Sequence, residues 1–323
     1  MNSNDITLFF EQQLAGWEAP RDRYRELEQV LYRRIAFPSF EIGIQCNPSR
    51  ILSSIAKTDA ESLKQRACFL CLKNLPEEQG SLSYNEQLDI RINPFPIFPY
   101  HFTVPTKEHT EQRIAGRFGD MLSLAQDLPG FIVSYNGPSS GASAPDHFHF
   151  QLVPRHALPL EKEVLSPFNE KLRVLAPEGL VIETIDPYIR KNLIIHGNDR
   201  ELFLHVLDTL YNILEGITPP EEPEPMLNLL AWHDGKEWWV ALFPRRKTRP
   251  WQFFAEGKEQ LLFSPGCIDF AGVIVSPRQS DYDQYTPALL RDLFGQLTID
   301  DDQWNYLKQH ITREDSFCNF TTR

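Results

Sequence analysis

The chain has 323 residues, of which 41% are hydrophobic and 24% charged, and its formal net charge is −12 at pH 7. This length and composition suit one large globular domain or two of ordinary size, with a substantial core. The negative charge disfavours nucleic-acid binding, which draws its affinity from Lys and Arg at phosphates, so an anionic partner is expected to be a small molecule held by a local basic pocket.

The pattern of the sequence indicates neither a membrane span nor a secretory signal. No window approaches about 18 uninterrupted apolar residues, and the first residues lack a basic segment followed by an apolar one. The five cysteines are an odd number in a chain too long to need disulfide cross-links, which favours thiols or metal ligands. We therefore expect a cytoplasmic protein.

Helices and then strands are predicted along the first third of the chain. Apolar residues recur at intervals of three and four over residues 6–17 and 23–35, which predicts two amphipathic helices that serve as scaffold. From about residue 37 to residue 109, β-branched and aromatic residues interrupted by prolines predict strands with irregular turns.

A helix over residues 113–128 and a strand over residues 130–137 lead to the segment HFHFQL, residues 147–152. Alternate side chains of a strand point to opposite faces. One face is therefore predicted to carry Phe148, Phe150 and Leu152, and the other to carry His147, His149 and Gln151.

The second half of the chain faintly repeats this arrangement. A predicted helix over residues 201–217 and an acidic, Pro-rich surface loop over 218–226 precede a predicted hairpin over 227–250, with Asp234 and Gly235 at its turn. Helix, strand, turn, strand and a Pro-Arg pair follow one another in both halves, which indicates an internal duplication.

The two histidines of the HFHFQ strand could perform chemistry at phosphorus or bind a metal. Neutral imidazole has a lone pair that can attack phosphorus or coordinate an ion. Rings at positions i and i+2 of a strand lie about 6.6 Å apart, close enough to reach one ligand. A pair of core histidines that hydrogen-bond to the backbone is the alternative.

The pair Cys68 and Cys71 could hold one zinc ion together with two further ligands. The candidates for those ligands are His101, His109 and one histidine of the HFHFQ strand. A redox role is disfavoured because the residues before Cys68 look helical, and two incidental thiols remain the alternative.

Two further segments could contact phosphate. Small residues in the loop 135–146 allow close approach of a ligand, although such loops often only turn the chain. The second segment is the basic run 245–249, whose alternative role is a solvated surface. The candidate residues are Asn136, Gly137, Ser139, Ser140, Ser143, Arg245, Arg246 and Lys247.

Taken together, the segments CFLC, NPFPIFPYHFTVPTKEH, YNGPSSGAS and HFHFQ resemble the histidine triad superfamily over roughly residues 40 to 155. They follow the order seen in its branch of galactose-1-phosphate uridylyltransferases, diadenosine tetraphosphate phosphorylases and GDP-hexose phosphorylases. The resemblance implies an α+β protein of tandem histidine-triad-like folds, with antiparallel sheets and flanking helices. The expected halves are residues 1–165, with the motifs, and 166–323, which completes the substrate pocket.

The resemblance also implies roles for individual residues. His149 is expected to be the nucleophile that forms a nucleotidyl-histidine intermediate, and Gln151, which replaces the third histidine of the triad, is expected to donate a hydrogen bond to the phosphate. Cys68, Cys71 and His147 would hold a structural zinc, with His109 favoured over His101 as fourth ligand.

These expectations amount to a nucleotidyltransferase or phosphorylase that acts on a nucleotide-sugar or a dinucleoside polyphosphate. The acceptor would be inorganic phosphate or a sugar phosphate. Two alternatives stay open: a zinc-stabilised nucleotide-binding protein without turnover, and a metal-dependent phosphohydrolase in which His147 and His149 hold one catalytic ion.

Overall fold

The structure, a computed structural model, describes residues 3–55, 59–166, 171–174 and 179–311. Its helices are α1 (Ser3–Gly16), α2 (Glu18–Glu26), α3 (Ile51–Ser54), α4 (Ala60–Gln65), α5 (Phe118–Asp127), α6 (Pro159–Glu163), α7 (Arg200–Glu215), α8 (Cys267–Phe270), α9 (Gln279–Tyr282), α10 (Pro287–Leu297) and α11 (Asp301–Ile311). Its strands are β1 (Leu31–Ala36), β2 (Glu41–Cys46), β3 (Leu82–Ser83), β4 (Asp89–Ile92), β5 (Phe102–Pro105), β6 (Phe131–Asn136), β7 (His149–Pro154), β8 (Lys171–Val174), β9 (Leu180–Ile185), β10 (Leu193–Gly197), β11 (Leu227–His233), β12 (Trp238–Pro244) and β13 (Val273–Ser276).

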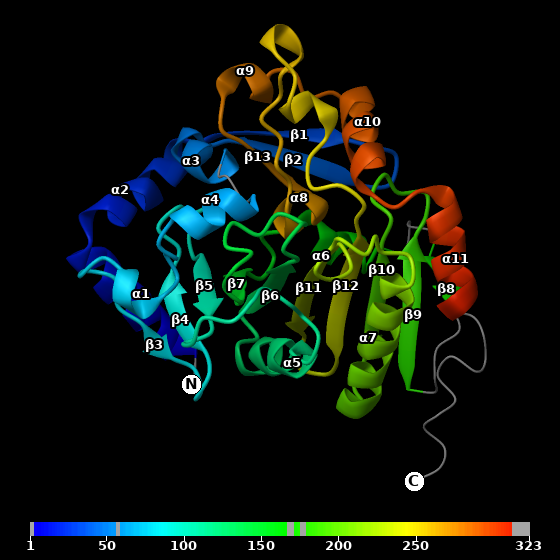
Figure 1. Cartoon of the computed structure of the whole chain (residues 1–323), viewed down its shortest axis with the longest axis horizontal. Coiled ribbons are helices and arrows are strands. Elements are labelled where there is room, and N and C mark those ends of the chain that lie inside the picture. Colours follow the sequence, from blue (N-terminus) through cyan, green and yellow to red (C-terminus); the bar gives the residue numbers. More distant parts are fainter. Residues whose placement is uncertain (1–2, 56–58, 167–170, 175–178, 312–323) are drawn as a thin grey trace.

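A ten-stranded sheet of antiparallel pairs forms the centre of the molecule, in the order β3-β4-β5-β7-β6-β11-β12-β10-β9-β8 (Figure 1). Counted outward from the central β6–β11 pair, one side reads β6, β7, β5, β4, β3 and the other reads β11, β12, β10, β9, β8. The strands thus occur in the same chain order on both sides, with α5 and α7 at corresponding places. The predicted α+β class with antiparallel sheets and flanking helices is confirmed.

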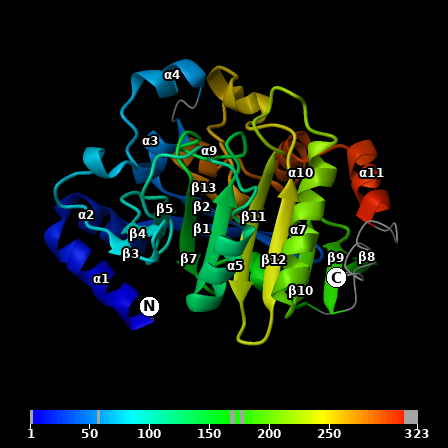
Figure 2. The same cartoon turned by 60° about the horizontal axis from the view of Figure 1, so that its bottom comes forward.

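Helices cover one face of this sheet and a smaller sheet covers the other. Helices α5 and α7 lie side by side on the first face, where they share a core with alternate strand residues (Figure 2). The second face packs against the three-stranded sheet β1-β2-β13 and against α8 and α10. Because β2 pairs with β13, segments from both ends of the chain build this covering layer over the second face.

The hairpin predicted in the second half is present, with Gly235 at φ 94° in its turn. The helix predicted over residues 23–35 is wrong in its second part. Helix α2 ends at Glu26, and residues 31–36 form β1 because they pair with β2 along their whole length. Pairing with a partner strand overrides the local periodicity here.

Among the described residues, no helix combines the length and the apolar character that a bilayer span requires.

Candidate active site

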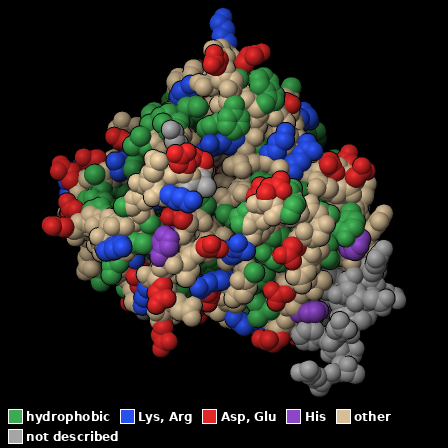
Figure 3. All heavy atoms as spheres, viewed as in Figure 1, with side chains coloured by type: hydrophobic (Ala, Val, Ile, Leu, Met, Phe, Trp, Pro, Cys, Tyr) green, Lys and Arg blue, Asp and Glu red, His purple; other side chains and the backbone are tan. Residues whose placement is uncertain are grey.

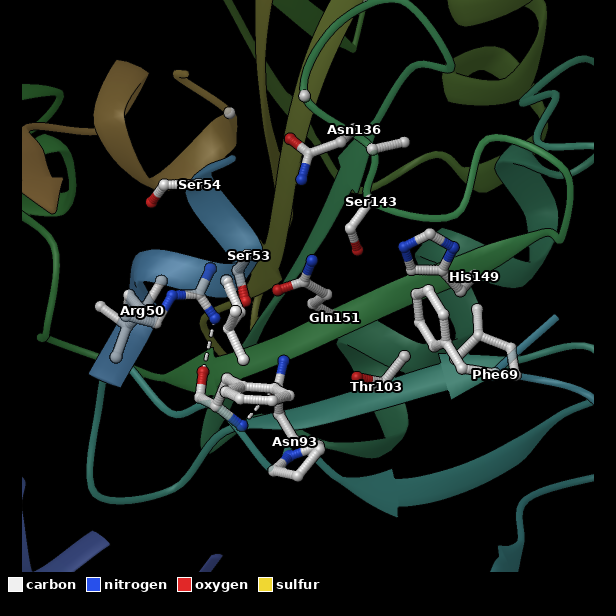
Figure 4. A pocket seen from close by; sticks show the side chains of 18 of the residues that line it. Arg50, Ser53, Ser54, Phe69, Asn93, Thr103, Asn136, Ser143, His149 and Gln151 are labelled. Atoms are coloured by element: carbon white, nitrogen blue, oxygen red, sulfur yellow. Dashed lines mark hydrogen bonds between the residues drawn. The ribbon is translucent and has the colours of Figure 1, made fainter. Parts of the chain in front are cut away.

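The alternation predicted for the HFHFQ strand is present in β7, which lies between β5 and β6. Phe148, Phe150 and Leu152 are fully buried in the core beneath α5. His149 and Gln151 point from the opposite face into a cavity of about 630 Å³ (Figure 4). Residues of the covering layer, such as Ile268 and Val275, close this cavity on its far side.

The hydrogen bonds of His149 fix which ring nitrogen faces the cavity. Its Nδ1 lies 2.9 Å from the carbonyl oxygen of His147 and therefore carries the proton that it donates there. The Nε2 atom is then left with a lone pair. Burial is the main cause that lowers the pKa of His149 to about 4, which keeps the ring neutral at pH 7. Gln112 accepts from the backbone N–H of His149 (2.7 Å) and holds the residue in place.

A similar argument fixes the orientation of the Gln151 amide. The backbone N–H of Ile97 donates to Nδ1 of His101, so the neutral ring carries its proton on Nε2. That proton is donated to Oε1 of Gln151 across 2.8 Å. The NH2 group of Gln151 is left to donate into the cavity. Burial lowers the pKa of His101 to about 3, so its ring stays neutral.

Asn136, at the end of β6, presents its amide in the same way. Its Oδ1 accepts hydrogen bonds from the backbone N–H of Cys267 (2.7 Å) and from Asn228 (2.9 Å), and its NH2 group faces the cavity (Figure 4). Gly266 allows this contact, since a Cβ atom there would lie 2.8 Å from Asn136 Oδ1. The side-chain NH2 groups of Gln151 and Asn136 therefore face the same cavity as His149, while their amide oxygens are already hydrogen-bonded to the protein.

His147 turns away from the cavity and joins a cluster of possible metal ligands. The ligand atoms of Cys68, Cys71, His109 and His147 all lie within 4.8 Å of one another. His147 Nδ1 is 3.3 Å from Cys68 Sγ, and His109 Nδ1 is 3.2 Å from Cys71 Sγ. Nitrogen and sulfur ligands of a tetrahedral zinc ion lie about 3.6 Å apart, so the four residues fit such an ion.

The partner of His147 supports its assignment as a ligand. Its Nε2 donates to the backbone oxygen of Thr106 at 2.8 Å, which leaves Nδ1 unprotonated and directed at the thiols. His101 takes no part in this cluster, because it is bonded to Gln151. Of the two histidines considered for the fourth position, the structure brings His109 to the cysteines.

Known proteins give the same picture of the fold. A family model described as "Domain of unknown function (DUF4922)" matches residues 9–154, and one described as "GDPGP1-like, C-terminal domain" matches residues 172–316. The structure of yeast Ap4A phosphorylase Apa2 is similar, with a TM-score of 0.61, 16% identity and coverage of 87% of this chain and 96% of that chain. For the structure of its complex with AMP, the TM-score is 0.58 and the identity 17%, with coverage of 89% of this chain and 97% of that chain.

The sequence resemblance to the histidine triad-like branch agrees with these comparisons, because the chain has the fold of an Ap4A phosphorylase and its second half matches a GDPGP1-like model. The comparison with curated proteins finds no match.

The Gly/Ser loop, residues 135–146, contributes only some of the predicted residues to the cavity. Asn136 and Ser143 line it, together with Gly141, whose φ of 98° and close approach to Pro265 require glycine. The other three are Gly137, Ser139 and Ser140. Their backbone oxygens accept bonds within the loop or from the second half, from Thr248 and Asn228.

Most of the basic run 245–249, which was expected to contact phosphate, lies away from the cavity. Arg245 is buried and donates to Asn228 Oδ1 (2.6 Å) and to three backbone oxygens, so it supports the fold. Arg246 donates to backbone oxygens near the end of α10, and Lys247 is exposed. Among the described residues of this run, Arg249 is the basic one that lines the cavity, next to Thr248.

The sequence did not predict three side chains of the site, two in the cavity lining and one, His101, behind it. Phe69 lies between the two cysteines and near His149 (Figure 4). Arg50 follows β2, and His101 orients Gln151. His101 was considered only as a metal ligand, and Arg50 has no local motif that could have revealed it.

Apolar side chains also surround this part of the molecule. Figure 3 shows several apolar side chains on the upper part of this face, interspersed with basic and acidic ones. Leu52 and Phe254 are 63% and 70% exposed. Leu52 lines the cavity, and Phe254 ends the short segment that follows Arg249.

Proposed function

We propose that the protein is a nucleotidyltransferase of the phosphorylase type that works through a nucleotidyl-His149 intermediate. The observation that carries this proposal is the state of His149. Its Nδ1–H is tied to the His147 carbonyl, so an unprotonated Nε2 faces a cavity that also receives the amide NH2 groups of Gln151 and Asn136.

In the first step, Nε2 of His149 attacks the α-phosphorus of a bound nucleotide. A P–N bond forms, the P–O bond to the leaving group breaks, and the leaving oxygen departs with the electron pair. The ring then carries positive charge, and its Nδ1–H bond to the His147 carbonyl stabilises that charge. In the second step an acceptor oxygen attacks phosphorus and the electron pair of the P–N bond returns to Nε2.

The amides of Gln151 and Asn136 stabilise the negative charge that grows on the phosphoryl oxygens. Their oxygens are already bonded, to His101 and to Cys267 and Asn228, so the NH2 groups are held in place before the substrate arrives. Donors that need no reorganisation during the reaction are the effective ones.

Zinc is the metal that the Cys68, Cys71, His109 and His147 set suits, and four protein ligands make such a site structural. When bound, the ion would cross-link the 68–71 loop to the start of β7. His147 supplies both a ligand and the carbonyl that orients His149, so the site also supports the nucleophile.

The structural likeness to yeast Ap4A phosphorylase and the match to the GDPGP1-like C-terminal model support a nucleotide phosphorylase or transferase. The donor we propose is a dinucleoside polyphosphate or a nucleotide-sugar. The acceptor is inorganic phosphate or a sugar phosphate.

The test is to incubate the protein with dinucleoside polyphosphates and with purine and pyrimidine nucleotide-hexoses, and to measure intact mass and phosphorolysis. We expect a nucleotidyl adduct with the wild-type protein and none with His149→Ala. Nucleotide binding without adduct or phosphorolysis over the whole panel would contradict the proposal and favour a non-catalytic binding protein.

Metal analysis separates the proposal from a phosphohydrolase that uses His147 and His149 on one ion. We expect one tightly held zinc that is lost in Cys68→Ser and retained in His149→Ala. Loss of the metal from His149→Ala would favour the hydrolase instead.

A further inference from the structure

Both halves of the chain line the cavity with polar and apolar side chains. The N-terminal half contributes aromatic residues such as Phe69 together with the polar Arg50, and the C-terminal half contributes the polar Arg249 together with the apolar Ile268. A cavity of about 630 Å³ with polar groups from both halves has room for a donor and an acceptor.

Arg50 is a cation in this cavity that forms no ion pair with a carboxylate in the described part of the chain. Its Nη1 donates to the backbone oxygen of Phe95 at 2.5 Å, and Figure 4 shows its guanidinium beside Gln151, which separates it from His149. A guanidinium has five donors, so one bond to a neutral oxygen leaves most of them for another partner.

The environment of Arg50 makes an anionic ligand favourable. Burial lowers its pKa to about 10, which still leaves the side chain charged at pH 7. The nearby Asp269 uses its two carboxylate oxygens on the backbone N–H groups of Gly266 and Val275. A charge that is partly withdrawn from water and has no oppositely charged contact costs free energy, and a bound anion reduces that cost.

Arg249 brings a guanidinium to the same cavity from the C-terminal half, in addition to Arg23, Arg50 and Arg91 of the N-terminal half. Its Nε donates to Ser264 Oγ at 2.9 Å, and its guanidinium lies over the ring of Phe253, 4.1 Å from the centroid. These contacts hold the side chain in a defined position. Arginines from both halves thus line one cavity of a protein whose net charge is −12.

We propose that Arg50 and Arg249 bind the phosphate group of the acceptor that attacks nucleotidyl-His149. This inference rests on the proposed function and adds the place where the acceptor binds. An acceptor oxygen forms the new P–O bond, the P–N bond breaks, and its electron pair returns to His149 Nε2. Arginine forks match phosphate oxygens in geometry and charge.

The test separates the two half-reactions. The protein is first loaded with the nucleotidyl group by prolonged incubation with excess donor and then freed of donor. It is next mixed with inorganic phosphate or with a hexose 1-phosphate. Loss of the adduct is followed by intact mass as a function of acceptor concentration, beside its slow hydrolysis by water alone.

For Arg50→Gln and for Arg249→Gln we expect the second-order rate constant with phosphate to fall about 10- to 100-fold, because a hydrogen-bonded charge is lost. Hydrolysis of the adduct by water should change less than about twofold. Arg50→Lys should recover part of the rate, because it keeps the charge. The matched control is Arg25→Gln, which removes an exposed arginine on α2 and should react as the wild type does.

Unchanged acceptor dependence in both glutamine variants would overturn the subsite, while absence of any adduct in the wild type would instead overturn the proposed function. If inorganic phosphate reacts, the subsite serves a phosphorylase. If only the hexose phosphate reacts, it serves a transferase, and both results support the same subsite. Binding of inorganic phosphate to unloaded protein by calorimetry is the second measurement, with the dissociation constant expected to rise at least about 10-fold in each variant.

Discussion

Strands β7 and β12 occupy corresponding places in the two halves of the sheet, yet they carry opposite kinds of side chain. Each strand ends in a proline, Pro154 or Pro244, that is followed by arginine. Counting back five residues from these prolines gives His149 in β7 and Trp239 in β12. The first faces the cavity, and the second is 6% exposed in the packed core.

The residues on the adjacent strands also differ in polarity between the two halves. Gln151 pairs with Thr103 and Ser134 on the adjacent strands, both polar. The corresponding Ala241 pairs with Ile194 and Leu230, both buried and apolar. In the second half, Trp239 stacks on His196 with ring centroids 4.2 Å apart.

The comparison shows that one backbone arrangement can carry either a cavity lined by polar side chains or a filled core. Strand order and pairing are the same in both halves, so the backbone does not make the difference. The difference lies in side-chain volume and polarity on one face of the sheet. Each of the following substitutions exchanges or removes one of these side chains.

His149→Ala should have the largest effect on function. Removing the proposed nucleophile is expected to lower turnover by at least about 10⁴-fold, because the covalent step then cannot occur. The free energy of unfolding should change by only about 1 kcal/mol, because the side chain faces a cavity. Steady-state kinetics and chemical denaturation measure the two quantities, and a variant that keeps turnover would show that β7 does not carry the nucleophile.

Trp239→Ala should have the opposite profile. Truncating a buried tryptophan is expected to lower the free energy of unfolding by about 3–5 kcal/mol, while the protein that stays folded still forms the adduct on His149. Denaturation and intact mass after incubation with donor measure these outcomes. Trp239→Phe is the control and should lower the free energy of unfolding by less. Loss of the adduct in a folded Trp239→Ala protein would mean that adduct formation in the first half depends on core packing in the second.

Gln151→Ala should lower the rate of adduct formation by about 10²- to 10³-fold, because it removes a donor to the phosphoryl oxygens. His101→Phe should reproduce part of this loss, because the Gln151 amide is then free to turn its oxygen to the phosphate. Single-turnover kinetics measure both. A loss confined to KM would indicate that Gln151 helps only to bind the substrate.

Ala241→Gln should have the smallest effect. The larger polar side chain enters a packed core and is expected to destabilise the protein by about 1–3 kcal/mol. Turnover should not change, because the second half lacks a histidine at the position that corresponds to His149. Melting temperature and turnover are the measurements, and an increase in turnover would mean that the second half is closer to a functional site than its packing indicates.

The sequence predicted much of the first half because its signals are local. The alternation over residues 147–152 assigned Phe148 and Phe150 to the core, and the structure has them there. The hairpin turn at Asp234 and Gly235 was equally clear. Residues 31–35 were misread as helix, because only the pairing with β2 makes them a strand.

The contributions of distant segments were harder to predict. The basic run indicated a phosphate contact, but Arg245 is held by Asn228 and by backbone oxygens, and the cavity receives Arg249. Glu224 lies in a segment predicted as a surface loop, yet it is buried and accepts from Tyr135 and from the backbone N–H of Ile114. Such contacts join residues far apart in the chain, so no local pattern encodes them.

By itself, the sequence determined the chemical groups of this protein and the local geometry that presents them: a strand with alternating faces, a pair of cysteines two residues apart and a turn of small residues. The tertiary structure decided the partner of each group. In the folded protein His147 lies beside the two cysteines, His101 is hydrogen-bonded to Gln151, and Arg50 and Arg249 line one cavity. The physical reason is that backbone stereochemistry fixes the direction of a side chain from its nearest neighbours, whereas burial and charge pairing depend on elements that meet only when both halves and the covering sheet have packed together.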